Sequence, residues 1–141
     1  MAQNIVTTVW KEKMTFESDN PLGNKIILDT SEENGGSSSG VSPKAMMLSS
    51  LAGCSGFDII ALLKKMRVEV DDFEMIVKGE LTEEHPKYYH TVWVDYHFKG
   101  SDLNEDKIEK AVNLSVDKYC GVMEMFRKFA EVNIKTHYHK K

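Results

Sequence analysis

The sequence predicts an α+β protein built around one long apolar helix, with the element order β-β-α-β-β-α-α-β. Segments rich in Val, Thr, Ile and aromatic residues, separated by turn-forming residues, predict strands near both ends of the chain. Ser42-Pro43 is a typical helix start, and residues 45–63 after it are apolar all round the expected helix. A second helical pattern, with a single apolar stripe, begins at Asn104. The length of 141 residues fits one domain, expected to span residues 1–141.

Two strands and a loop are expected before the long helix. Residues 5–16 are rich in Val, Thr, Trp and Phe and predict one strand, and residues 25–29 predict the returning strand of a hairpin. Between them, residues 18–24 form a cluster of turn-forming residues. Residues 31–40 are too polar and too rich in glycine for a regular element, so we expect a mobile loop there. Such a loop is either an active-site flap or a plain surface connection.

The long apolar helix must be covered on more than one side. A helix that is apolar all round is either buried or membrane-spanning. Its single charge, Asp58, would cost roughly 2.5–3.5 kcal/mol near the centre of a bilayer, so we expect a core helix and no membrane association. One sheet covers only one side of such a helix. Either the strands split into two sheets or a second copy of the chain covers the other side; we favour a symmetric homodimer with its two long helices in the middle.

Two further strands should form a hairpin after this helix. Residues 68–81 alternate in part, and the change of phase at Asp71-Asp72 predicts a bulge. Residues 88–98 alternate more regularly, which places two sets of side chains on opposite faces of the strand. The apolar set is Val92, Val94, Tyr96 and Phe98, and the opposite set is Trp93, Asp95 and His97.

The C-terminal part should hold two helices and a final strand. The second helix begins with Asn104 as its cap and extends to Tyr119. Cys120-Gly121 interrupts the pattern, and residues 122–128 predict a short third helix. The final strand places four side chains on one face: Val132, Ile134, Thr136 and Tyr138.

Composition excludes several classes of function. A net charge of −4 gives no general attraction to phosphate backbones, so nucleic acid is not an expected partner. The N-terminus has no secretory pattern, which predicts a cytoplasmic protein with reduced cysteines. Two cysteines cannot supply a four-ligand zinc site, and His137 and His139 have no third ligand placed beside them. We therefore expect no metal and no cofactor.

Cys54 and Cys120 are the candidate chemical groups. A buried cysteine taken alone usually packs as a small apolar residue, so a structural role for each is a real alternative. The counter-signal is that Gly53 and Gly56 flank Cys54 in the helix. Each glycine lowers helix propensity by ~1 kcal/mol, so space beside the sulfur must serve a purpose.

The residues around both cysteines resemble the OsmC/Ohr family. The resemblance rests on Gly40-Val-Ser-Pro-Lys-Ala-Met-Met-Leu-Ser-Ser-Leu-Ala-Gly-Cys54, followed much later by Asp117-Lys-Tyr-Cys120. In that family a proline-containing start leads into a long helix, a run of small residues ends at a cysteine, and a second cysteine follows downstream. The resemblance covers nearly the whole chain, because the expected element order also fits the family fold.

The resemblance implies an intertwined homodimer that acts as a thiol peroxidase on organic hydroperoxides. By position, Cys54 would be the peroxidatic cysteine and Cys120 the resolving one, with a dithiol reductant as a further partner. The family also uses an arginine on an early strand and an acidic residue ten positions before the helix cysteine. This chain is divergent: it has Lys44 at the acidic position and no early arginine.

A cation is still needed to stabilise a thiolate in the middle of a helix. The candidates are Lys44, Arg127, Lys11 and Lys13. The departures from the family pattern leave a second hypothesis open, in which an OsmC-like dimer binds a small apolar or electrophilic ligand at the subunit interface without turnover. Phe57, Met123, Met125 and Phe126 could line a pocket for either role, although core packing is the simpler interpretation.

Overall fold

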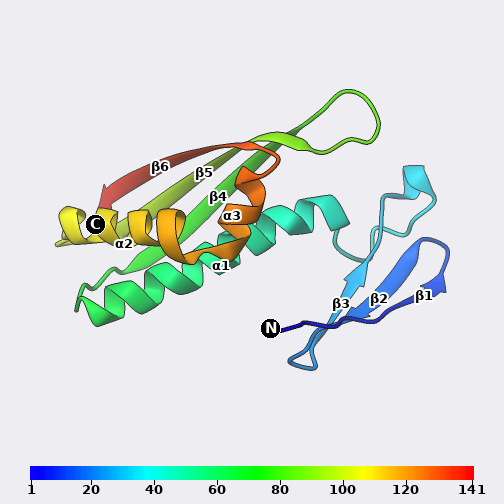
Figure 1. The fold of residues 1–141 in the computed structure, drawn as a ribbon, viewed down its shortest axis with the longest axis horizontal. Coiled ribbons are helices and arrows are strands. Elements are labelled where there is room, and N and C mark those ends of the chain that lie inside the picture. Colours follow the sequence, from blue (N-terminus) through cyan, green and yellow to red (C-terminus); the bar gives the residue numbers. More distant parts are fainter. The chain divides into compact units, whose positions relative to one another are not determined.

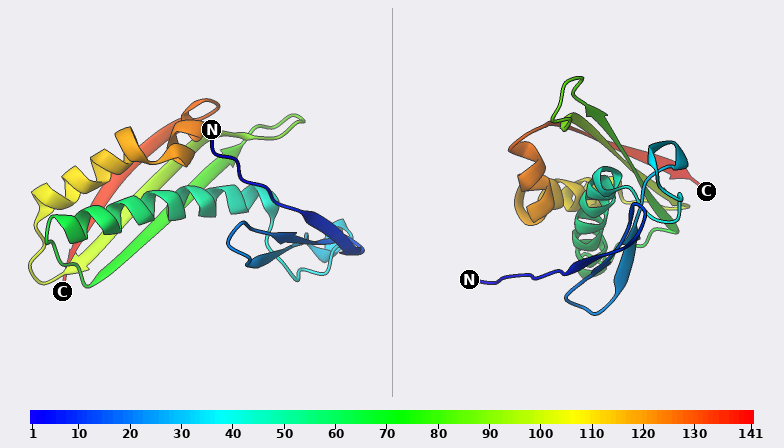
Figure 2. Two further views of the ribbon diagram at one scale, coloured as in Figure 1. Left: turned by 60° about the horizontal axis from the view of Figure 1, so that its bottom comes forward. Right: turned by 90° about the vertical axis from the view of Figure 1, so that its right-hand side faces the viewer.

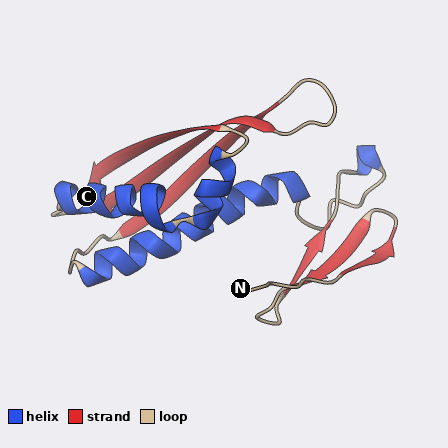
Figure 3. Cartoon of the chain, in the orientation of Figure 1, coloured by secondary structure: helices blue, strands red, loops and turns tan.

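The computed structural model describes residues 1–141, which form two compact units, Met1–Met47 and Leu48–Lys141. Each unit has its own three-stranded sheet, with the orders β1-β2-β3 and β4-β5-β6 (Figure 1). Figure 3 distinguishes the helices of the second unit from the two sheets. The chain is therefore α+β, as predicted. The expectation of one domain over residues 1–141 stays a prediction.

The first unit contains three strands where the sequence predicted two. The expected strand over residues 5–16 is wrong, because β1 (Thr8–Glu12) turns sharply into β2 (Thr15–Asp19). Lys13 takes a positive φ of 48° in this turn, a conformation that residue pattern alone does not reveal. β3 (Lys25–Leu28) then pairs antiparallel with β2 and completes the sheet.

The carboxylate of Asp29 organises the polar loop after β3. Its Oδ2 accepts hydrogen bonds from the backbone N–H of Ser37 and of Ser39, both at 3.1 Å, and from the Ser39 hydroxyl at 2.6 Å. Its Oδ1 accepts from the N–H of Thr30 at 2.7 Å. A Cβ at Gly36 would collide with the carbonyl oxygen of Thr30, so this position requires glycine.

The loop therefore holds more order than its composition indicated. It includes the 3₁₀ turn η1 (Glu32–Asn34), which corrects the expectation that no regular element forms there. Local hydrogen bonds between a side chain and the backbone stabilise this loop, as a hydrophobic core stabilises other segments. The interpretation of this loop as a flap stays a prediction.

Replacing Asp29 by Asn should loosen this loop. The hydrogen bonds to Ser39 hold the pKa of the Asp29 carboxyl well below its usual range. A lowered pKa means that the stabilisation is present above the unfolded value of ~3.9 and is lost as pH falls below it. We expect backbone amides of residues 30–39 to exchange at least roughly tenfold faster in Asp29→Asn at neutral pH, as measured by hydrogen-exchange mass spectrometry.

The wild-type loop should also lose protection on acidification, and the Asn variant should not show this acid dependence. Glu33→Gln, at an exposed carboxylate in the same loop, is the control and should leave exchange unchanged. Equal exchange in Asp29→Asn and wild type would contradict the role of this carboxylate.

The second unit packs helices on one face of its sheet. The long helix α1 (Pro43–Lys65) enters this unit at Leu48, and β4 (Asp72–Leu81) and β5 (Tyr89–Gly100) form an antiparallel hairpin. β6 (Glu131–Lys140) returns parallel to β5. The views in Figures 1 and 2 place α1 and α2 on the same side of this sheet.

The alternation predicted for β5 is confirmed. Val92, Val94, Tyr96 and Phe98 are all buried, while Trp93, Asp95 and His97 lie on the other face and are only half-buried. The bulge predicted at Asp71-Asp72 is wrong, because β4 begins at Asp72 and its register with β5 stays regular until Glu80. Residues 68–70 precede the strand and do not belong to it.

The connection from β5 to β6 contains α2 (Glu105–Leu114), the π-helical turn η2 (Ser115–Tyr119) and α3 (Gly121–Arg127). The Asn104 side chain caps α2 by accepting the N–H of Lys107 at 3.1 Å, as the sequence predicted. The predicted α-helix to Tyr119 is wrong at its end, where the wider turn follows Leu114. This turn ends at Cys120, whose N–H bonds the carbonyl oxygen of Ser115 at 2.8 Å.

Candidate functional site

Cys54 lies in the middle of α1, half-buried, with its neighbours leaving room on one side. A Cβ added at Gly53 would meet no atom within 4 Å, so the helix surface beside Cys54 is open there. At Gly56 an added Cβ would fall 2.7 Å from the terminal methyl of Met75 on β4. The two glycines therefore serve different purposes: Gly53 leaves open space, and Gly56 allows α1 to approach the sheet.

Cys120 is buried at the start of α3, beside Cys54. Its sulfur accepts the backbone N–H of Met123 at 3.3 Å and so caps this helix. The Cys120 thiol is also close enough to Cys54 for the two side chains to interact, and both cysteines are free. Burial and then this interaction raise the pKa of Cys120 above its usual range. At neutral pH, Cys120 is therefore a protonated thiol in contact with the sulfur of Cys54.

A chain of buried hydroxyl groups joins α1, β5 and η2. The Ser55 hydroxyl is 2.6 Å from that of Tyr96 and 2.8 Å from that of Ser115. Ser115 in turn donates to Oδ2 of Asp58 at 3.1 Å. The side chains of Ser55, Tyr96 and Ser115 are fully buried, and burial raises the pKa of Tyr96 to about 12. The hydroxyls are thus neutral and end at a half-buried carboxylate.

The candidate cations differ in their ion-pair partners and in the unit to which they belong. Arg127, at the end of α3, pairs with Asp117 at 3.6 Å, and its charge also acts on the Tyr96 hydroxyl. Lys44 is exposed in the first turn of α1, ten residues before Cys54, which is about 15 Å along a helix axis. Lys11 pairs with Glu17 at 3.0 Å. Of these, Arg127 belongs to the same unit as the thiols and acts on the hydroxyl chain beside them.

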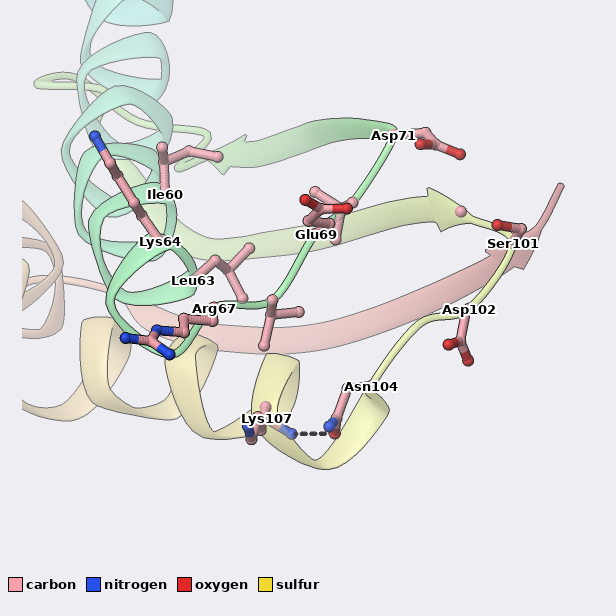
Figure 4. A pocket seen from close by; sticks show the side chains of 13 residues that line it. Ile60, Leu63, Lys64, Arg67, Glu69, Asp71, Ser101, Asp102, Asn104 and Lys107 are labelled. Carbon is pink, nitrogen blue, oxygen red and sulfur yellow. Dashed lines mark hydrogen bonds between the residues drawn. The ribbon is translucent and has the colours of Figure 1, made fainter.

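A large hollow of the second unit lies away from the two cysteines. It is a groove of about 910 Å³ where α1 ends and α2 begins, lined by Lys64, Arg67, Asp102 and Lys107 among others (Figure 4). Its charged side chains have both signs and point in different directions. Of the four residues considered for an apolar pocket, Met123 and Phe126 are buried in the core, while Phe57 and Met125 are exposed.

Three histidines gather on the outer face of the sheet. His97 Nδ1 lies 2.9 Å from His139 Nε2, His137 stacks on His97, and His137 Nε2 is 2.7 Å from Asp95 Oδ1. The sequence had placed only His137 and His139 together, because the parallel pairing that adds His97 is not visible in one strand. No group of three or more His, Cys, Asp or Glu side chains is arranged to hold a metal ion.

Comparison with known proteins identifies the family. The family model described as OsmC-like protein matches residues 35–135. Protein YhfA of Escherichia coli K12 is 34% identical over 123 residues, which cover 87% of this chain and 89% of that protein. The chain belongs to the OsmC-like family.

Solved structures of other proteins share this OsmC-like fold. A hypothetical protein from Aquifex aeolicus VF5 has a TM-score of 0.87 and 31% identity, covering 100% of this chain and 99% of that one. A Legionella pneumophila structure described as an organic hydroperoxide resistance protein OsmC has a TM-score of 0.70. Its identity is 17%, with coverage of 97% and 98%, so this likeness concerns the fold alone.

The sequence did not reveal the hydroxyl chain of this OsmC-like protein. Ser55 and Ser115 were not singled out, and Tyr96 was predicted only as a residue of the buried face of β5. The sequence marked Asp58 only as the single charge of the apolar helix, whereas its carboxylate accepts a hydrogen bond from the Ser115 hydroxyl. The available signal was weak: a serine next to Cys54 and one carboxylate in an apolar helix.

Removing a hydroxyl from the middle of the chain should destabilise the protein. Ser115→Ala removes the hydroxyl that Asp58 accepts from and one of the two hydroxyl partners of Ser55, so we expect the free energy of unfolding to fall by about 1–3 kcal/mol. Urea denaturation followed by circular dichroism measures this loss. Ser101→Ala, at an exposed serine, is the control and should stay within about 0.5 kcal/mol of wild type. A similarly small loss in Ser115→Ala would argue against the network.

Proposed function

We propose that this OsmC-like protein is a dithiol peroxidase that reduces organic hydroperoxides, with Cys54 as the peroxidatic cysteine and Cys120 as the resolving one. The observation that carries the proposal is the close approach of the two free thiols, whose side chains interact. A pair of cysteines that serves only packing has no need for contact between the sulfurs. The Legionella pneumophila structure with the same fold is described as an organic hydroperoxide resistance protein, which supports this reaction class.

The reaction follows ordinary sulfur chemistry. The Cys54 thiolate attacks the outer oxygen of the hydroperoxide, an S–O bond forms, the O–O bond breaks, and the alkoxide takes a proton to leave as an alcohol. The sulfur of Cys120 then attacks the sulfenic acid of Cys54, forming the S–S bond and releasing water. A dithiol reductant reopens the disulfide. The raised pKa of Cys120 keeps this thiol protonated, which favours Cys54 as the attacking sulfur.

The difference from the usual family pattern must be compensated by this chain's own cations. Neither the early arginine nor the acidic residue ten positions before Cys54 is present. We assign thiolate stabilisation to Arg127, whose charge already acts on the adjacent Tyr96 hydroxyl, with Lys44 as the weaker candidate. The reversal of charge at Lys44 favours a second candidate function, in which the protein binds a small apolar or electrophilic ligand without turnover.

Titration with an organic hydroperoxide separates these two functions. If the peroxidase proposal is right, one equivalent of an alkyl hydroperoxide removes two hydrogens from the wild-type protein, as seen by intact mass. Cys54→Ser should not react, because it lacks the attacking sulfur. Cys120→Ser should stop at a sulfenic acid that dimedone traps. If the thiols of the wild type stay reduced while an apolar ligand still binds, the peroxidase proposal is wrong and the ligand-binding function is supported.

The outer face of α1 supports a homodimer. By length and composition alone this helix could cross a membrane, but Leu51, Ile59 and Leu63 pack in the core beside the sheet. On the other side, Phe57 is 81% exposed and Ile60 50% exposed. Large apolar side chains that line an exposed helix face indicate an interaction surface. We propose an intertwined cytoplasmic homodimer in which a second copy covers this face and completes the site around Cys54.

A charge on this face should break the dimer. Burial of one Phe side chain contributes about 1.5–3 kcal/mol, so Phe57→Glu should raise the dimer Kd by more than roughly tenfold. Size-exclusion chromatography with light scattering over a range of concentrations measures the change. Ile76→Glu, at a side chain 51% exposed on β4, is the matched control and should stay dimeric. A wild-type protein that is monomeric at high concentration would end this part of the proposal.

A further inference from the structure

The hydroxyl chain has a direction that its own protons determine. Each hydroxyl carries one proton, and an ionised carboxylate can only accept. The Ser115 hydroxyl donates to Asp58 at 3.1 Å and has the Ser55 carbonyl oxygen as a more distant acceptor at 3.3 Å, so the bond between the Ser55 and Ser115 hydroxyls uses the proton of Ser55. The bond between Ser55 and Tyr96 must then use the proton of Tyr96. All three protons therefore point toward Asp58, which is the final acceptor of this chain of fully buried hydroxyls.

Asp58 follows Cys54 by four residues in α1, so both side chains lie on the same face of this helix, and Cys54 interacts with Cys120. Ser55 directly follows Cys54, and the carbonyl oxygen of Ser115 accepts the N–H of Cys120 at 2.8 Å. The charge of Asp58 acts on Cys120 itself. Asp58 is half-buried, so its carboxylate is accessible to solvent and can pass a proton outward. A carboxylate placed beside a thiol that must lose its proton has the chemistry of a general base.

We propose that Asp58 accepts the proton of Cys120 as the disulfide closes, and that Ser115, Ser55 and Tyr96 position this carboxylate. The proposal rests on the roles given above to the two cysteines. In this step the sulfur of Cys120 attacks the sulfenic sulfur of Cys54, and its proton passes to Asp58. The S–O bond breaks, and the leaving hydroxide takes a proton from Asp58 and departs as water. Asp58 is thereby restored as a carboxylate, and no further reactant is needed.

The step can be followed by itself in a single turnover. Wild-type protein is mixed with one equivalent of alkyl hydroperoxide, quenched with dimedone at set times, and analysed by intact mass for the trapped sulfenic acid and for the disulfide. With Asp58 as the base, the rate of closure should be nearly independent of pH around neutrality. In Asp58→Asn it should fall by about 100-fold or more and rise with hydroxide concentration, about tenfold per pH unit.

Three further variants separate a base from a structural residue. Asp58→Glu keeps the carboxylate and should restore most of the rate and the flat pH profile. Ser115→Ala loses one positioning hydrogen bond and should slow closure roughly fivefold to tenfold. Asp102→Asn, at an exposed carboxylate in a loop, should close like the wild type. If Asp58→Asn closes at the wild-type rate with the wild-type pH profile, the proposal is wrong, whatever the variant's stability.

A second oxidant keeps this test independent of the peroxidase proposal. Diamide adds to one thiol and is displaced by the other, so the disulfide again closes by attack of a cysteine that must give up its proton. If the wild type fails to react with hydroperoxide, the proposed peroxidase function falls, and the diamide reaction still tests Asp58. The same loss of rate and the same change of pH profile in Asp58→Asn are expected there. Their absence overturns the role of Asp58.

Discussion

The packing of one face of α1 against the sheet β4-β5-β6 is the interaction on which the rest of this OsmC-like structure depends. Leu51, Ile59 and Leu63 are removed from water on this face. Gly56 lies between them in sequence, and its missing side chain leaves room for Met75. This close approach brings the buried hydroxyl of Ser55 within 2.6 Å of Tyr96 on β5. The apolar contact thus determines where the polar groups meet.

A polar chain inside an apolar core is costly unless every member is satisfied. Here no buried side-chain nitrogen or oxygen lacks a hydrogen-bond partner. The π-helical turn after α2 makes this possible, because it places Ser115 opposite Ser55 and ends at Cys120. An uninterrupted α-helix would carry these residues to other positions around its axis. The irregular backbone and Cys120 are therefore parts of one arrangement.

The same arrangement suggests how a divergent member of the family could keep thiol chemistry with different charges. In our proposal, two other residues take the place of the usual arginine and its acidic partner. Arg127 supplies the positive charge that stabilises the thiolate, and Asp58 supplies a carboxylate that accepts the proton of Cys120. Both act on the region of Tyr96, Arg127 lowering and Asp58 raising the pKa of its hydroxyl. The two cysteines also differ in burial, because Cys120 is buried and Cys54 only half-buried.

The sequence by itself determined the features that depend on local pattern. The apolar helix after Ser42-Pro43, the buried face of β5 and the cap at Asn104 all follow from side-chain spacing and from the needs of helix ends. It also marked Cys54 and Cys120, through flanking glycines and family resemblance. It missed the turn at Lys13, since an unusual φ at a lysine has no compositional signal.

Only the tertiary structure decided which residues surround the thiols. Ser55, Tyr96 and Ser115 lie 41 and 60 positions apart in the chain, and no local spacing relates them. Their contact depends on how closely α1 approaches β5 and on the width of one helical turn. Asp29 is similar on a smaller scale, because its hold on the loop requires the loop to fold back on β3. Packing geometry joins residues that the order of the chain keeps apart.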